Sequence, residues 1–313
     1  MDALAGLLEG PRASGAFLLR IVLDPPWSIR VQDGSPLCLA AMLSGEGWFV
    51  PDHGEPAWVR PGDVAIMRGP DPYTMSDGRT GEPQVIVHPG QRCETPDGVE
   101  LAEKMALGVR TWGSDPDGSV TMLLGAYEQV GAVSQRLLDA LPPLLVVSAD
   151  TWDSTLLSLL GREITEQGPA QGVVLDRLLD LLLISVLRVW FDRPGSEAPA
   201  WYRAYDHPVV GHALRLLHED PAYHWTLAGL ASEVGVSRAT LAQCFTDEVG
   251  TPPMTYLTEW RLALAADLLR EPDVTLNAVA QEVGYGSGFA LSSAFKRVRG
   301  VSPQEYRTAA AAR

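Results

Sequence analysis

The stretch Leu230–Ser237, which reads LASEVGVS, has the pattern of a helix-turn-helix. Ala231 is small enough for two helices to cross closely, and Gly235, four positions later, can adopt the positive φ that the tight turn requires. Ser237 occupies the position of a helix N-cap, where its hydroxyl can accept a hydrogen bond from a free backbone N–H. An apolar stripe follows at four-residue spacing: Leu241, Phe245 and Val249.

The same pattern recurs farther along the chain in Val279–Ser287, which reads VAQEVGYGS. Ala280 and Gly284 keep the four-residue spacing, and Ser287 takes the cap position. The second apolar stripe is Leu291, Phe295 and Val298, and glycines predict the C-terminal ends of both second helices, at Gly250 and Gly300. Because repeats define an architecture, the sequence predicts two DNA-reading units on one chain.

A further helix is predicted between the two copies, from Pro253 to Leu269, with Pro272 ending it. At 1.5 Å per residue, this helix is about 24 Å long. With its flanking turns it can hold two recognition helices about one DNA turn, roughly 34 Å, apart. The alternative is that the helix only packs the domain, and both roles are compatible.

The exposed positions of the two second helices are the candidate DNA contacts. Gln243 can hydrogen-bond to an adenine edge, and Phe289 can contact a thymine methyl group. Arg238 is also a candidate base contact, whereas the cationic end of the second copy, which also includes Arg299, is suited to phosphates. We expect the first copy to carry more of the base specificity. The full set is Arg238, Ala239, Thr240, Gln243, Thr246, Ser287, Gly288, Phe289, Ser292, Ser293, Lys296 and Arg297.

The charge of the chain is unusual for a DNA-binding protein, with 24 Lys and Arg against 39 Asp and Glu, a net charge of −15. After Ala200 the balance is 10 basic against 12 acidic residues, so most of the acidity lies in the first part. Two alternatives remain open at this point: loss of DNA binding, or an acidic first domain that docks a basic partner protein.

Residues from about Pro208 to Arg307 resemble the DNA-binding domain of the AraC family of bacterial transcription regulators. The motifs that carry the resemblance include Trp260-Arg261, Gly284-Tyr285, Ala294-Phe295-Lys296-Arg297 and Gly300-Val301-Ser302-Pro303. The resemblance implies double-stranded DNA as the partner, with RNA polymerase as a further partner. The chain departs from the family where arginine is common, at Gln243 or Cys244 and at Ser293, which predicts modest affinity and binding as a dimer.

The first part of the chain is rich in short apolar runs separated by turn residues, which predicts a β-sandwich or barrel. The element Pro61-Gly62-Asp63-Val64 resembles the turn and strand of a cupin barrel. The predicted fold is therefore α+β with two domains. A cupin-like domain covers residues 1–192, with the barrel at about 12–128 and helices at about 132–192. A linker covers 193–205, and the double helix-turn-helix domain covers 206–313.

The barrel is expected to bind a small, partly apolar effector or to sense a redox signal. The proposed lining is Trp27, Met42, Trp48, Met67, Tyr73 and His88, and the redox candidates are Cys38 and Cys93, the latter next to Arg92. Cupin enzymes hold a metal with a His-x-His pair, which the sequence lacks, so no metal, cofactor or catalytic residue is expected. The alternatives are a metal-dependent cupin enzyme with an accessory helical domain, and a zinc site of Cys and His.

The predicted helices of residues 132–192 are apolar around much of their circumference, which favours a homodimer contact, with packing inside the subunit as the alternative. The most apolar stretch, Val173–Trp190, contains four charged residues and is not expected to span a membrane. No export signal is recognised, and three widely spaced cysteines suit a reducing compartment, so a cytoplasmic protein is expected.

Overall fold

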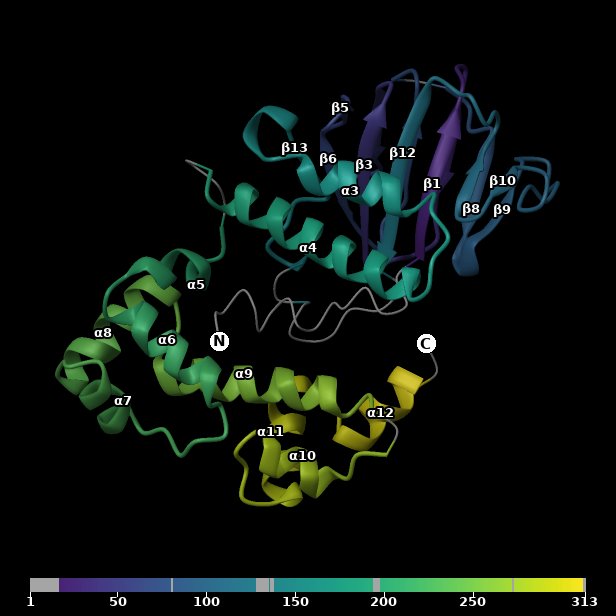
Figure 1. Cartoon of the computed structure of the whole chain (residues 1–313). Helices are drawn as coiled ribbons and strands as arrows, with labels where there is room; N and C mark the ends of the chain where they lie inside the picture. Colours follow the sequence, from purple (N-terminus) through teal and green to yellow (C-terminus); the bar gives the residue numbers. More distant parts are fainter. Residues whose placement is uncertain are drawn as a thin grey trace. The chain divides into compact units, whose positions relative to one another are not determined.

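A computed structural model describes residues 17–79, 81–127, 135, 138–193, 198–271 and 273–311. They form two compact units, with residues 17–127 and 140–193 in the first and residues 198–311 in the second (Figure 1). Four features of the prediction fall outside the described residues. They are the barrel start near residue 12, the helix start near residue 132, linker residues 194–197, and Pro272. In the part of the chain that is described, no helix is long and apolar enough to cross a membrane.

The first unit contains a seven-stranded sheet built around the long strands β1, β12 and β3, which pair antiparallel. Strands β12 and β3 are buried along nearly their whole length, because helices cover one face of the sheet and the second sheet covers the other. In spatial order the strands are β10 (Ala106–Gly108), β11 (Thr111–Gly113), β1 (Phe17–Leu23), β12 (Val120–Tyr127), β3 (Leu37–Ser44), β6 (Val64–Arg68) and β13 (Leu144–Val147).

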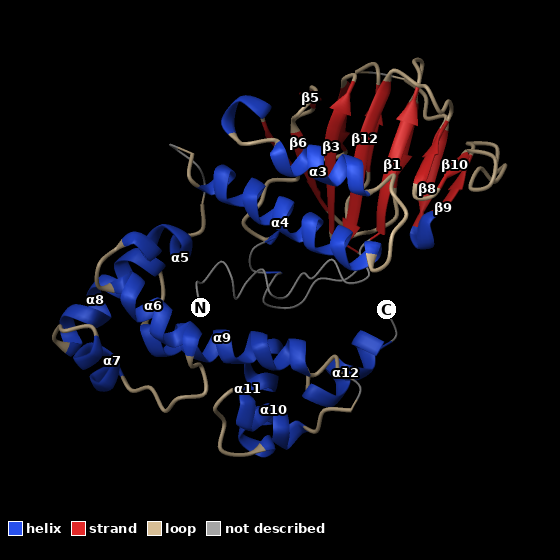
Figure 2. Ribbon diagram, viewed as in Figure 1, coloured by secondary structure: helices blue, strands red, loops and turns tan. Residues whose placement is uncertain are grey.

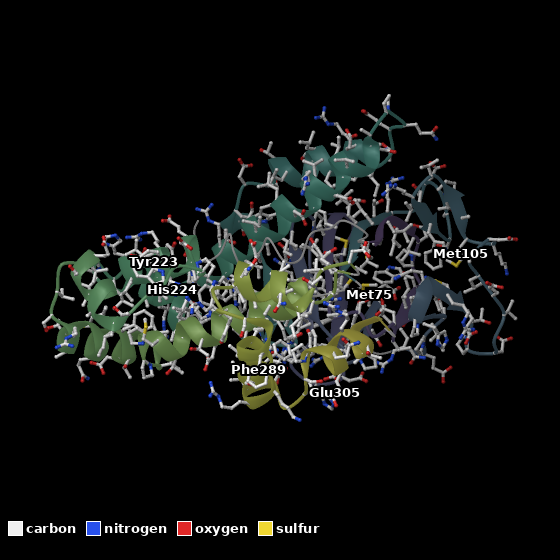
Figure 3. All side chains as sticks on the ribbon, turned by 90° about the horizontal axis from the view of Figure 1, so that it is seen from below. Met75, Met105, Tyr223, His224, Phe289 and Glu305 are labelled. Atoms are coloured by element: carbon white, nitrogen blue, oxygen red, sulfur yellow. The ribbon has the colours of Figure 1, made fainter. Side chains whose placement is uncertain are left out.

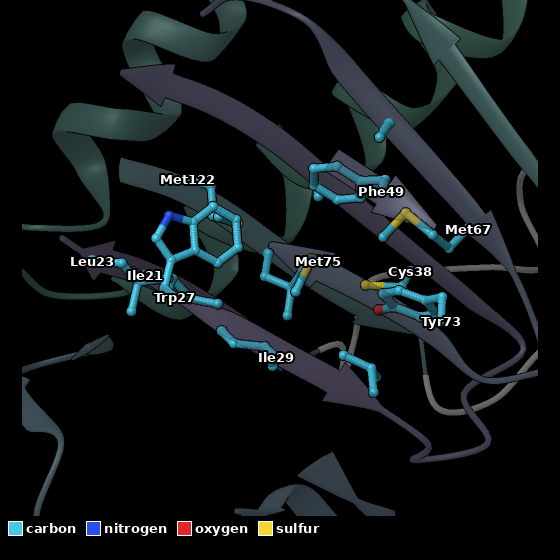
Figure 4. Close-up of a cluster of buried hydrophobic side chains, with 14 of the residues drawn as sticks. Ile21, Leu23, Trp27, Ile29, Cys38, Phe49, Met67, Tyr73, Met75 and Met122 are labelled. Atoms are coloured by element: carbon cyan, nitrogen blue, oxygen red, sulfur yellow. The ribbon is translucent and has the colours of Figure 1, made fainter. Parts of the chain in front are cut away.

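A second, six-stranded sheet packs against the first, and their facing side chains form one apolar core (Figure 4). The two sheets are open, so the predicted barrel has the form of a flattened two-layer structure. Strands β5, β7, β9, β10 and β11 were not among the predicted runs, because most of them are three residues long. In spatial order the strands are β5 (Ala57–Val59), β4 (Gly47–Pro51), β7 (Tyr73–Ser76), β2 (Ser28–Val31), β8 (Val85–His88) and β9 (Arg92–Glu94).

Helices α3 (Thr155–Glu163) and α4 (Gln171–Phe191) cover the outer face of the seven-stranded sheet (Figure 1). The closest approach is at Gly125 of β12, where a Cβ atom would lie 2.8 Å from the side chain of Leu179. Tyr127 of the same strand donates a hydrogen bond of 3.5 Å to the Leu179 carbonyl. A glycine at position 125 therefore lets α4 pack directly on the sheet.

The second unit is helical and contains both predicted helix-turn-helix motifs (Figure 2). Helices α7 and α8 form the first motif, α10 and α11 form the second, and α9 connects them. The helices are α5 (Ala200–Arg203), the short 3-10 turn η3 (Ala204–Asp206), α6 (Val210–Glu219), α7 (Leu227–Glu233), α8 (Arg238–Val249), α9 (Pro253–Leu268), α10 (Leu276–Glu282), α11 (Gly288–Arg299) and α12 (Pro303–Ala311). Residues 200–205, which the sequence assigns to the linker, are thus helical.

The local signals of the repeat are confirmed at the predicted positions. Ser237 accepts a hydrogen bond from the backbone N–H of Thr240 at 3.1 Å, and Ser287 accepts one from Ala290 at 3.2 Å. The turn glycines have φ of +73° and +79°, and the C-terminal glycines have φ of +85° and +77°. Each motif therefore has the same turn, the same cap and the same stop.

The predicted apolar stripe of the second copy is wrong at one position. Val298 exposes 47% of its surface, whereas Ala294 is buried beside Leu291 and Phe295. The reason is the helical period: Ala294 lies three residues after Leu291 and so stays on the buried face of α11.

Candidate DNA interface and sensor cavity

The first recognition helix, α8, presents polar and small residues to solvent at its N-terminal half. Arg238, Ala239 and Thr240 are exposed on its first turn, and Gln243 is exposed one turn later. Thr246 is half-buried, and its hydroxyl donates a hydrogen bond of 2.7 Å to the Ala242 carbonyl, so it is less available to DNA. The N-terminal residues of a recognition helix are those that contact base edges.

Gln243 is held in place by an acidic neighbour on the same helix. Its amide nitrogen donates to both carboxylate oxygens of Asp247, at 2.8 and 2.9 Å. This pair leaves the amide oxygen of Gln243 as an acceptor. It also places a negative charge beside the predicted base contact, which sequence analysis did not consider.

The second recognition helix, α11, presents an aromatic side chain at its start. Phe289 exposes 85% of its surface (Figure 3). Ser293 is exposed one turn later, while Ser292 is half-buried. The neighbouring Gly288 is buried: its N–H donates to the Asn277 side-chain oxygen at 2.9 Å, and a Cβ atom would lie 2.6 Å from that oxygen. Gly288 therefore serves the packing of α10 on α11, and Ser287 caps the helix.

The two recognition helices end in opposite charges. Lys296, Arg297 and Arg299 are exposed at the end of α11, where positive charge also interacts favourably with the helix dipole. The end of α8 has Asp247 and Glu248 instead. Phosphate contacts are therefore better supported on the second copy than on the first.

The guanidinium of Arg261, on α9, makes hydrogen bonds inside its own domain. Its guanidinium donates to the carbonyl oxygens of Pro221 and Tyr223 at 2.6 and 2.7 Å. Partial burial lowers the pKa of Arg261 from its usual value. These bonds tie α9 to the segment that precedes α7, so Arg261 supports the arrangement of the two motifs.

A cavity of about 190 Å³ lies between the two sheets of the first unit. Strands β1, β12, β3 and β11 contribute from the seven-stranded sheet, and β2, β7, β8 and β9 contribute from the six-stranded one. The lining is mostly aliphatic: Leu19, Ile21, Ile29, Val31, Asp33, Cys38, Tyr73, Met75, Val87, Gln91, Cys93, Ala102, Trp112, Leu124 and Ala126.

Of the six residues that the sequence proposes for the effector pocket, Tyr73 lines this cavity. Trp27, Met42 and Met67 are buried in the same apolar core but not in the cavity wall. Trp48 contacts Trp58 in a tilted arrangement with 5.2 Å between the ring centroids, and the Arg79 guanidinium lies 5.3 Å from the Trp48 ring. Trp48 therefore belongs to a separate aromatic contact. Trp112, which sequence analysis missed, lines the cavity from a three-residue strand.

His88 is half-buried outside the cavity wall. Its Nε2 lies 2.7 Å from a carboxylate oxygen of Glu94, and its Nδ1 lies 3.4 Å from the Gln32 amide nitrogen. Within the described residues, no group of three or more His, Cys, Asp and Glu side chains is arranged to hold a metal ion. The contact with Glu94 joins β8 to β9 at His88.

Both thiols proposed for redox sensing line the cavity, but burial works against their reactivity. Burial raises the pKa of Cys38 to about 12, and burial also raises the pKa of Cys93. A reactive cysteine needs a lowered pKa, because the thiolate is the nucleophile. The neighbouring Arg92 does not supply the missing positive charge, because its guanidinium pairs with Glu94.

Comparison with known proteins agrees with this architecture. A family model described as Cupin matches residues 2–192, and one described as Helix-turn-helix domain matches residues 230–309. AraC-like transcription regulators of Streptomyces antibioticus and Streptomyces lividans are 36% and 32% identical to this chain, over 98% of both chains in each case. A solved AraC-type regulator from Chromobacterium violaceum is 29% identical over 34% of this chain and 96% of its own, with a TM-score of 0.32.

The chain belongs to the AraC-like transcription regulators. It is a DNA-binding regulator that joins a cupin-like sensor domain to an AraC-type helix-turn-helix domain. In this AraC-like regulator, the exposed first turns of α8 and α11 are the candidate DNA contacts, and the cavity between the two sheets is a candidate site for the signal.

Proposed function

We propose that this AraC-like regulator contacts double-stranded DNA with the exposed N-terminal halves of α8 and α11, and that occupancy of the cavity controls this binding. The observation that carries the first part is the matched presentation of two capped recognition helices with exposed first turns. The cavity supports the second part, because a regulator needs a site whose occupancy distinguishes two states. Its relatives are transcription regulators, so we infer action by binding rather than catalysis.

In this proposal the first copy contacts bases and the second copy contacts mainly phosphates. Arg238 and Gln243 of α8 contact base edges, where arginine favours guanine and the glutamine amide favours adenine. Lys296, Arg297 and Arg299 bind the phosphate backbone at the end of α11. The opposite charges at the two helix ends support this division.

We propose an effector molecule as the signal rather than thiol oxidation. The raised pKa values of Cys38 and Cys93 leave little thiolate near neutral pH, whereas the mostly aliphatic cavity wall suits a ligand.

Dimerisation through α4 is part of the proposal. Val173, Val174 and Leu181 expose 59%, 41% and 45% of their surfaces on this helix. A second copy of α4 would cover them, and two copies would bring two pairs of recognition helices to DNA. Such pairing would raise the overall affinity without new contacts on either copy.

The test measures binding of the full chain to DNA from the promoter region of its own gene, at several salt concentrations. We expect affinity to fall steeply with salt, and Arg238→Ala to weaken binding about tenfold and to relax the base preference at one position. Arg215→Ala is the matched control, because Arg215 is exposed on α6, outside both motifs. DNA binding that does not depend on salt concentration and is unchanged by Arg238→Ala would contradict the proposal.

A further inference from the structure

The size of the cavity limits the signal to a small molecule. An apolar cavity of about 150 Å³ inside a protein binds benzene. The cavity here, at about 190 Å³, therefore has room for an aromatic ring with two or three additional non-hydrogen atoms. It lies between strands of both sheets, so a ligand there touches both layers of the sensor domain.

The charges around the cavity disfavour an ionised ligand. Among the described residues that line it, none is basic, and Asp33 is the acidic one. The Asp33 carboxylate already accepts hydrogen bonds from the backbone N–H of Ser35 at 3.0 Å and from its hydroxyl at 2.7 Å. An anion would enter without a counter-ion and near a negative charge, and a buried unpaired charge is strongly unfavourable.

Two polar atoms on the cavity-lining side chains lack a strong hydrogen-bond partner. They are the Tyr73 hydroxyl, on β7 of the six-stranded sheet, and the Trp112 indole N–H, on β11 of the seven-stranded sheet. Both side chains are more than nine-tenths buried. The Tyr73 hydroxyl lies beside the Cys38 thiol, but a thiol is a weak hydrogen-bonding group and leaves the capacity of the hydroxyl largely unfilled (Figure 4).

Both orphaned groups can donate a hydrogen bond, and the indole can only donate. Buried donors are nearly always paired in folded proteins, so an unpaired donor in a cavity wall indicates where a ligand acceptor belongs. An aliphatic wall with donors and no cation selects an uncharged molecule.

We propose that the cavity binds an uncharged, mainly hydrocarbon molecule of about nine non-hydrogen atoms whose single oxygen acceptor, such as a ketone, is bound by Tyr73 and Trp112. This inference rests on the proposed effector site and specifies the chemistry of its ligand. The hydrocarbon part fills the space between Ile21, Ile29 and Met75, and the oxygen lies toward the two donors.

Four probes of equal size separate the chemistries. Acetophenone has the ketone, isopropylbenzene has no acceptor, benzoate is an anion, and benzamidine is a cation. Calorimetric titration of the full chain, without DNA, should show acetophenone binding at least tenfold more tightly than benzoate or benzamidine. Tightest binding of either ion, or no binding of any probe at millimolar concentration, would overturn the proposal.

The role of the hydroxyl is tested by Tyr73→Phe, which removes one oxygen atom and leaves the ring. We expect acetophenone affinity to fall about two- to tenfold, as for loss of one neutral hydrogen bond, with isopropylbenzene affinity unchanged. Tyr127→Phe is the matched control, because Tyr127 is a buried tyrosine of the same domain outside the cavity wall. Equal losses for both probes would show a packing effect and contradict the assignment.

Failure of this inference is distinguishable from failure of the proposed function. The titrations contain no DNA, so they report on the cavity even if the chain binds DNA poorly. If acetophenone binds as expected but leaves DNA affinity unchanged, the ligand chemistry stands and the proposed regulatory coupling is overturned.

Discussion

Phe289 exposes 85% of its surface on the first turn of α11, where packing gives a large aromatic side chain no stabilisation. The first turn of a recognition helix is also where side chains reach base edges in the major groove. An aromatic ring cannot read hydrogen-bonding groups there, but it can contact the C5-methyl group of thymine. Phe289 is therefore expected to give the second copy a preference for thymine.

Removing this contact from the protein or from the DNA should weaken binding in the same way. Phe289→Ala is expected to weaken binding to a preferred DNA site, selected from random sequences by the full chain, by about tenfold, or ~1.4 kcal/mol. Replacing the critical thymine by uracil deletes only the methyl group and should weaken the natural protein several-fold, while leaving the variant unaffected. Fluorescence anisotropy of labelled DNA measures both changes.

Val298→Ala provides the control for this experiment, since Val298 is an exposed apolar residue at the other end of α11. Its loss should not change the thymine preference. A uracil substitution that weakens both proteins equally would contradict the contact with Phe289.

At the level of elements, the two helix-turn-helix turns look alike in backbone conformation but differ in surroundings. Gly235 and Gly284 both have positive φ. A Cβ atom on Gly235 would have nothing within 4 Å, whereas one on Gly284 would lie 2.7 Å from the Ala222 carbonyl oxygen and 2.9 Å from the Arg261 guanidinium. The second turn is thus packed against the segment that Arg261 holds.

These surroundings predict unequal costs for the same substitution. Gly235→Ala should lower the free energy of unfolding by about 1–2 kcal/mol, because alanine is strained at positive φ. Gly284→Ala should cost about 1–3 kcal/mol more, because the methyl group meets a backbone oxygen that cannot move freely. Both free energies are measured by urea denaturation of the full chain, monitored by the far-UV circular dichroism signal of its helices. Equal costs for the two substitutions would contradict the packing argument.

For the molecule as a whole, α9 joins the two reading units. Its 16 residues span about 24 Å, which suits recognition helices about one DNA turn apart on one face of the duplex. Five base pairs inserted between the two contacted segments would turn the second segment to the opposite face. We expect this insertion to weaken binding more than tenfold in a footprinting titration.

A DNA site with five base pairs replaced, rather than inserted, at the same place is the control, and it should bind nearly as well as the original. If the insertion is tolerated equally, the two units do not bind as one rigid pair. In that case α9 would serve only to pack the domain.

The helix-turn-helix domain was predictable because its signals are local. A cap acts over three residues, a turn glycine acts through its own φ, and an apolar stripe repeats every three or four residues. Thr226 and Thr275, which cap α7 and α10, carry the same kind of signal and could have been found in the same way.

The cavity was largely unpredictable because its wall is assembled from distant strands. Tyr73 reaches it by pairing of β7 with β2, and Trp112 reaches it by pairing of the three-residue strand β11 with β1. Neither strand has enough alternation to show which face is buried, and Trp27, Met42 and Met67 are as apolar as the residues that line the wall. Local chemistry in the chain was thus sufficient to specify two helix-turn-helix motifs, whereas strand pairing across the sensor domain selected which buried side chains surround the cavity.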